Sequence, residues 1–215
     1  GSSAHPERQA GPHAHSATLT PDERFAIVSD LGMDQLLVYT LDRNAGKLGA
    51  HTHISTRPGA GPRHMAFHPG GQHLYVANEL DSTVVVYDYD TASGALHERQ
   101  TIDSLPPGAS ESWVADIHVA PYGQRLYVSN RGHDSLAVFD IDSQGRLTQV
   151  AFPSCGGNWP RNFALAPGGR FVLAANQYSG DVSVLPVLTG TQALGAPVAR
   201  AEVARASYVG FVGAG

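Results

Sequence analysis

Residues 63–78 read RHMAFHPGGQHLYVAN, and this stretch sets the pattern for the whole chain. Two short apolar runs flank a Pro-Gly-Gly turn, in which glycine permits the positive φ that tight turns need. Three further segments have the same form: HSATLTPDERFAIVSD at 15–30, ADIHVAPYGQRLYVSN at 115–130 and RNFALAPGGRFVLAAN at 161–176. Their turn prolines, Pro21, Pro69, Pro121 and Pro167, are 48, 52 and 46 residues apart. A period of this size, carrying several strands, predicts an all-β propeller.

Each repeat is expected to form a blade of four strands. In the second repeat, the strands are predicted at 64–68, 73–78, 83–89 and 95–102. The third of these is rich in β-branched and aromatic residues, which suits a sheet buried on both faces. An acidic residue stands between the second and third strands of every repeat, where we expect it to bond to turn amides. These residues are Asp34, Asp81, Asp134 and Asp181.

The repeat boundaries predict one propeller domain over residues 1–215. The four repeats span about 12–60, 61–112, 113–158 and 159–206. Residues 207–212 resemble one more first strand, with no blade after it. Because a closed propeller often completes one blade with strands from both chain ends, we expect the N-terminal part of a larger propeller to be missing. The alternative is a complete, small propeller of four blades.

Composition excludes several classes of function. The chain is 42% hydrophobic and 15% charged, and its formal charge of −5 leaves no basic footprint for nucleic acid. No apolar run approaches the roughly 18 residues that suggest a membrane span. Nothing in the sequence implies a protein partner. The single cysteine, Cys155, permits no intrachain disulfide, which fits a reducing compartment, and we expect a cytoplasmic protein.

Polar residues recur where the blades should share one rim. Strands one and two of a blade run antiparallel, so the start of the first lies beside the end of the second. Six residues before each turn proline stand His15, Arg63, Ala115 and Arg161. Just after the second strands stand Leu31, Glu79, Arg131 and Gln177. The residue type at these positions changes between repeats but is mostly polar, which favours a binding site. The alternative interpretation is that these residues are solvated charges on the surface.

Several stretches resemble the lactonase propeller family, which includes bacterial propeller-type 6-phosphogluconolactonases and fungal carboxy-muconate lactonising enzymes. They are Pro12-His13-Ala14-His15-Ser16, Gly61-Pro62-Arg63-His64, Ala77-Asn78-Glu79 and Ser129-Asn130-Arg131-Gly132-His133-Asp134-Ser135. The loop Pro6-Glu7-Arg8-Gln9 also resembles the family's sequence before PHAHS. The resemblance covers the whole chain and implies a seven-bladed propeller, of which this chain supplies four blades and the inner strand of the closing one.

The resemblance implies catalytic or binding roles for four residues: His15, Arg63, Glu79 and Arg131. Arg161, His64, His118 and His133 are further candidates for binding substrate. The implied activity is hydrolysis of a phosphorylated sugar lactone, 6-phosphogluconolactone above all. Alternatives are a lactonase or cycloisomerase for a muconate-type lactone and a propeller that only binds.

Lactone opening needs an activated water and a stabilised oxyanion. His15 or Glu79 is a candidate general base, and the two act together in our interpretation. Arg63 and Arg131 would bind the 6-phosphate or face the oxyanion. No serine or cysteine has a supporting nucleophile motif, and Cys155 is interpreted as structural. No metal or other cofactor is expected, since the 11 histidines show no HExxH or zinc-finger spacing.

Overall fold

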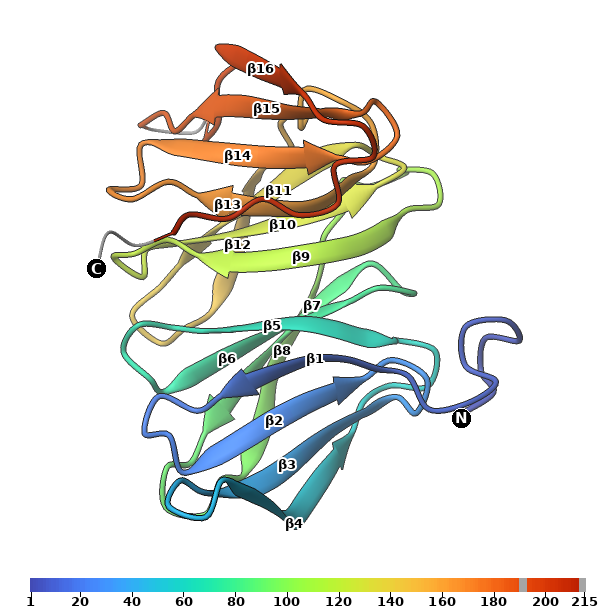
Figure 1. The fold of residues 1–215 in the computed structure, drawn as a ribbon, viewed down its shortest axis with the longest axis vertical. Coiled ribbons are helices and arrows are strands. Elements are labelled where there is room, and N and C mark those ends of the chain that lie inside the picture. Colours follow the sequence, from blue (N-terminus) through green and yellow to red (C-terminus); the bar gives the residue numbers. More distant parts are fainter. Residues whose placement is uncertain (190–192, 213–215) are drawn as a thin grey trace. The chain divides into compact units, whose positions relative to one another are not determined.

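The computed structural model describes residues 1–189 and 193–212, which contain sixteen strands in four antiparallel sheets and no helix. Each sheet has four strands in sequence order (Figure 1). The first two sheets are β1 (Ala14–Leu19), β2 (Phe25–Asp30), β3 (Gln35–Asp42), β4 (Lys47–Ser55) and β5 (Pro62–Phe67), β6 (His73–Asn78), β7 (Thr83–Tyr89), β8 (Leu96–Asp103). The others are β9 (Trp113–Val119), β10 (Arg125–Arg131), β11 (Ser135–Ile141), β12 (Leu147–Ala151) and β13 (Pro160–Leu165), β14 (Phe171–Asn176), β15 (Asp181–Pro186), β16 (Ala199–Glu202).

The predicted all-β fold is confirmed, and the strands of the second repeat lie within two residues of their expected bounds. The chain divides into two compact units, Gly1–Asp103 and Ser104–Gly215, each with two sheets. Residues 207–212 form no strand. A strand needs a paired backbone, whereas the Val209 amide donates to the Asn162 side chain, at 2.8 Å.

Burial differs between the strands of each sheet. The second and third strands are largely buried, and Val84, Val86 and Tyr87 are each at most 1% exposed. The outermost strands β4 and β16 are almost wholly exposed. In each unit, the hydrophobic core draws side chains from both of its sheets. Burial of each large apolar side chain contributes roughly 1.5–3 kcal/mol, so the sheet faces supply most of the stability.

A β-bulge disrupts the first strand of every sheet at the same place. In three sheets the extra residue is the one six positions before the turn proline: His15, Arg63 and Arg161. In β9, Ala115 and Asp116 lie opposite the single residue Ser129. A bulge leaves one residue out of the pairing and turns its side chain in a new direction. The positions predicted from repeat alignment therefore coincide with a feature that redirects side chains.

Two of the four acidic residues between the second and third strands, Asp34 and Asp134, join the two successive sheets of their own unit. The Asp34 carboxylate accepts hydrogen bonds from the Gly59 and Gly61 amides, each at 2.8 Å, and from Ser2 Oγ at 2.7 Å. Asp134 accepts one from the Trp159 amide at 2.7 Å. The structural role was expected, but these partners lie mainly in the loop that enters the next sheet.

Asp34→Ala should lower the free energy of unfolding by about 2–4 kcal/mol, because it removes the acceptor for two backbone amides in a buried place. Urea denaturation of the variant measures the loss. Asp140→Ala, which removes a carboxylate that is 57% exposed, is the matched control and should cost less than about 1 kcal/mol. Equal losses in the two variants would contradict the assigned role of Asp34.

Candidate active site

The first unit brings His15, Arg63 and Glu79 to one end of its sheets. Pro62 pairs with Asn78, so the bulged Arg63 lies beside Glu79, the residue that follows β6. The Glu79 amide donates to the Gly61 carbonyl at 2.8 Å, which continues the pairing one residue beyond the strand. The expected meeting of strand starts and strand ends is present in this unit.

A buried ion pair joins Arg63 and Glu79. Arg63 Nε donates to Glu79 Oε2 at 2.7 Å, and both side chains are 2% exposed. Charges buried to this degree are tolerated only when they are paired and hydrogen-bonded. The guanidinium thus favours an ionised Glu79.

A second guanidinium, that of Arg8, binds the other carboxylate oxygen. Arg8 Nη2 donates to Glu79 Oε1 at 2.6 Å, and the Arg8 side chain is 36% exposed. Its Nε is buried with no hydrogen-bond partner among the described residues. The neighbouring Gln9 fixes this N-terminal loop, since it is fully buried and donates to the Leu31 carbonyl at 2.9 Å.

Sequence reasoning left Arg8 out of the candidate set. It precedes β1, so it has no counterpart in the repeat alignment. The signal that points to it is the Pro6-Glu7-Arg8-Gln9 stretch, which resembles the family's sequence before PHAHS.

His15 is a neutral imidazole in this environment. Burial lowers its pKa from 6.5 to about 3, and the positive charge of Arg63 and the neighbouring His64 act in the same direction, while Glu79 opposes them. The His15 ring lies 5.2 Å from the His64 ring and 5.7 Å from the His13 ring. Its Nδ1 is buried and has no hydrogen-bond partner within residues 1–189 and 193–212. Such a nitrogen is able to accept or donate one hydrogen bond to a ligand or water.

Arg131 lies in the second unit, at the end of β10. It is 5% exposed, and it donates from Nε to the Trp113 carbonyl at 3.2 Å and from Nη2 to the Val114 carbonyl at 2.9 Å. Its guanidinium carbon lies 5.6 Å from the centre of the Trp159 ring. These contacts fix the orientation of the charged group.

The other candidates of the second unit differ in their surroundings. Arg161 is half-buried, and within the part of the chain that the structure describes it forms no ion pair. His133 Nδ1 lies 2.8 Å from Ser135 Oγ, an ordinary contact within its own turn. His118 Nε2 lies 3.0 Å from the buried carboxylate of Asp116. The Asp116 carboxylate also accepts a hydrogen bond from Asn162 Nδ2 at 2.5 Å. The sequence analysis did not predict Asp116 as a site residue.

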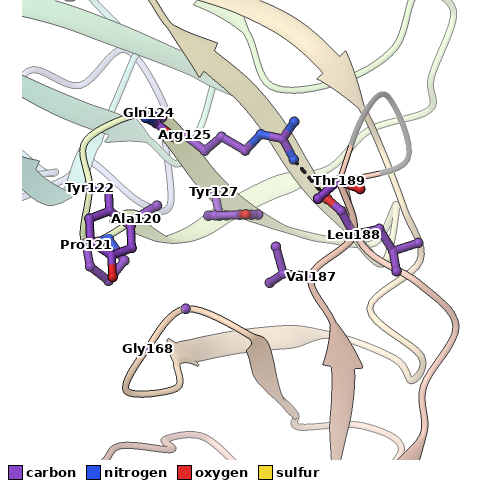
Figure 2. Close-up of a pocket in the computed structure, with 11 residues that line it drawn as sticks. Ala120, Pro121, Tyr122, Gln124, Arg125, Tyr127, Gly168, Val187, Leu188 and Thr189 are labelled. Atoms are coloured by element: carbon purple, nitrogen blue, oxygen red, sulfur yellow. Dashed lines mark hydrogen bonds between the residues drawn. The ribbon is translucent and has the colours of Figure 1, made fainter.

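Two cavities of the second unit lie along its strands. One, of ≈360 Å³, is lined by His118, Phe163 and residues 208–211. The other, of ≈320 Å³, is lined by residues at the start of β10 and just after β15, among them Arg125, Tyr127 and Val187 (Figure 2). Arg131 lies at the other end of β10. The main polar group of this cavity, Arg125, donates to the Leu188 carbonyl at 3.4 Å and to Asp140. Burial raises the pKa of its Tyr127. The residues that line this second cavity include no His, Asp or Glu that could act as a general base.

Cys155 fits its predicted structural role. The side chain is fully buried, and burial raises its pKa to about 12. Since the thiolate is the reactive form, this thiol is a poor nucleophile.

Within residues 1–189 and 193–212, no three His, Cys, Asp or Glu side chains are grouped so that they could hold a metal ion. The same residues form no helix that is long and apolar enough to cross a membrane.

Repeated four-stranded antiparallel sheets, each with its strands in sequence order, are the blades that define the β-propeller class. The family model described as "Lactonase, 7-bladed beta-propeller" matches residues 1–211. The chain belongs to this family.

Individual relatives agree with the family match. The chain is 40% identical to the 6-phosphogluconolactonase of Bacillus subtilis (strain 168), over 82% of this chain and 50% of the relative. It is 37% identical to that of Pectobacterium carotovorum, over 88% of this chain and 57% of the relative. The structure of a periplasmic gluconolactonase of Pseudomonas aeruginosa superposes with a TM-score of 0.92 at 35% identity, over 99% of this chain and 60% of that one. The chain thus spans about half the length of the curated relatives it matches.

Proposed function

We propose that the protein is a lactonase that hydrolyses 6-phospho-D-glucono-1,5-lactone to 6-phosphogluconate. The observation that carries the proposal is a neutral His15 with an unpartnered Nδ1, next to a carboxylate held by two arginines. The names of the relatives support the substrate. A cytoplasmic location is part of the proposal and rests on the free Cys155, which suits a reducing compartment.

His15 acts as the general base in this mechanism. It is uncharged at neutral pH, so its ring can take a proton from a water molecule as the water oxygen attacks the lactone carbonyl carbon. Both oxygens of Glu79 already accept hydrogen bonds from Arg8 and Arg63, which leaves Glu79 a poor base. Its negative charge instead stabilises the imidazolium that forms on His15, since the two groups attract.

The arginines supply positive charge for the substrate. As water adds, the carbonyl oxygen becomes an oxyanion, and Arg63 stabilises it or binds the 6-phosphate. Arg8, which is the more exposed partner of Glu79, adds a further cation for an anionic substrate. When the tetrahedral intermediate collapses, the bond between the carbonyl carbon and the ring oxygen breaks. The ring oxygen takes the proton back from His15, and the product is the open hydroxy acid.

A pH-stat assay of acid release tests the proposal, with the spontaneous rate in buffer subtracted. We expect the protein to hydrolyse 6-phosphogluconolactone at least tenfold faster than buffer, and faster than D-glucono-1,5-lactone, because the arginines bind the phosphate. A muconate-type lactone, the earlier alternative, should be a poorer substrate. Hydrolysis of all three at the buffer rate would disprove a lactonase, and binding without turnover would favour a propeller that only binds.

A further inference from the structure

Residues 1–13 form a loop that precedes β1 (blue in Figure 1) and is bonded to the first sheet. Near its beginning, Ser2 Oγ donates to the Asp34 carboxylate at 2.7 Å. In its middle, the fully buried Gln9 donates from Nε2 to the Leu31 carbonyl at 2.9 Å. These bonds fix the loop to the turn that joins β2 and β3.

Arg8 extends from this loop to the second sheet, where its Nη2 donates to Glu79 Oε1 at 2.6 Å. A guanidinium has five N–H donors. Among the residues that the structure describes, Glu79 is the only hydrogen-bond acceptor of the Arg8 side chain. Its Nε is buried without a partner there. A buried donor without an acceptor is destabilising, so this guanidinium favours an oxygen atom from a bound molecule.

The two arginines that bind Glu79 differ in exposure. The Arg63 side chain is 2% exposed, whereas that of Arg8 is 36% exposed. A phosphate carries close to two negative charges at neutral pH, and taking such a group fully out of water is costly. It therefore binds more readily to the guanidinium that reaches solvent. Arg63 is the one that acts on His15, whose pKa it lowers, and so lies closer to the reacting carbonyl.

The charges and the shape of the substrate fit this division. The cluster of Arg8, Arg63, Glu79 and the neutral His15 carries one net positive charge, which attracts an anion. In 6-phosphogluconolactone, the carbonyl carbon and the carbon that bears the phosphate arm both adjoin the ring oxygen, so the two groups leave neighbouring positions of the ring. The two guanidinium groups are also neighbours, since they bind the two oxygens of one carboxylate.

We infer that Arg8 binds the 6-phosphate and sets the preference for a phosphorylated lactone, while Arg63 serves the reacting carbonyl. The inference rests on the proposed function and names the residue that recognises the phosphate of that substrate. It assigns Arg8 to specificity, not to the chemical step. Gln9 is then a positioning residue, which holds the loop that carries Arg8.

Arg8→Met tests the inference, because methionine keeps a long, unbranched side chain without the charge. The ratio of kcat/KM for 6-phosphogluconolactone to kcat/KM for D-glucono-1,5-lactone should fall about 10–100-fold. This ratio isolates the phosphate, since loss of the contact with Glu79 affects both lactones alike. Arg57→Met is the matched control: it removes an arginine that is 64% exposed and pairs with Asp81, and it should leave the ratio unchanged.

Two further variants separate the roles of charge, shape and position. Arg8→Lys keeps the charge but loses the planar guanidinium, and the ratio should fall about 3–10-fold. It decides the question if Arg8→Met does not fold. Gln9→Ala loosens the loop and should lower the same ratio, whereas a purely structural role of Gln9 would lower the rates for both lactones equally.

Binding of the products gives a readout that does not depend on turnover. By isothermal titration calorimetry, Arg8→Met should raise the Kd of 6-phosphogluconate about 10–100-fold and change that of gluconate less than about threefold. Binding of 6-phosphogluconate that depends on Arg8, without hydrolysis by the wild type, would support the phosphate site and reject the lactonase. Hydrolysis by the wild type, with the ratio and the Kd of 6-phosphogluconate unchanged in the Arg8 variants, would overturn the role of Arg8 alone.

Discussion

Replacing Glu79 with glutamine should lower kcat/KM for 6-phosphogluconolactone by about 10²–10³-fold. The amide keeps the shape of the carboxylate but removes the charge that stabilises the His15 imidazolium and holds Arg8 and Arg63 in place. Stability should also fall, by about 3–5 kcal/mol, because Arg63 is 2% exposed and loses the charge that compensates it.

Steady-state kinetics and urea denaturation, on the same preparation, measure the two effects of Glu79→Gln. Glu98→Gln is the matched control, since Glu98 is exposed in β8, and it should change neither. A Glu79→Gln variant that stays folded and turns over at the wild-type rate would remove Glu79 from the proposed machinery.

His15→Asn should lower kcat by about 10²–10⁴-fold, because asparagine keeps polar contacts but accepts no proton. The pH profile of the wild type gives a second signature. With the pKa of His15 at about 3, kcat/KM should show no inflection near pH 6.5 and should fall only as the pH approaches 3. D-glucono-1,5-lactone is the suitable substrate, since it lacks a phosphate that titrates near neutral pH.

The low pKa of His15 also makes stability depend on pH. The unfolded chain binds a proton below pH 6.5 that the folded chain refuses until about pH 3, so stability falls as the pH drops through this window. Because His15 is partly solvated, we expect a loss of about 1–2 kcal/mol at pH 4 relative to pH 7. His15→Asn should lack this part of the loss. An identical pH dependence in both proteins would show that His15 does not resist protonation.

Alignment of the repeats predicted that Arg63 and Glu79 lie close together. The reason is that, in a pair of antiparallel strands, the start of one strand lies beside the end of the other. Once Asn78 ends a strand opposite the start of β5, Arg63 and Glu79 must be close. The bulges could not be predicted, since each lies close to the start of its strand, where too few residues precede it to reveal a break in the alternation. The residues that form the bulges were instead predicted as site candidates, because their residue type changes from one repeat to the next.

Arg8 was missed for a physical reason. It lies in a loop before the first repeat, and only the fold brings that loop to Glu79.

A crystal structure of the protein with 6-phosphogluconate is the most direct test of where the chemistry takes place. The account predicts that the product carboxylate, formed from the lactone carbonyl, binds within hydrogen-bond distance of His15 Nδ1 and of an arginine that contacts Glu79. Product bound instead in the cavity lined by Tyr122 and Tyr127, with His15 still unpartnered, would contradict it.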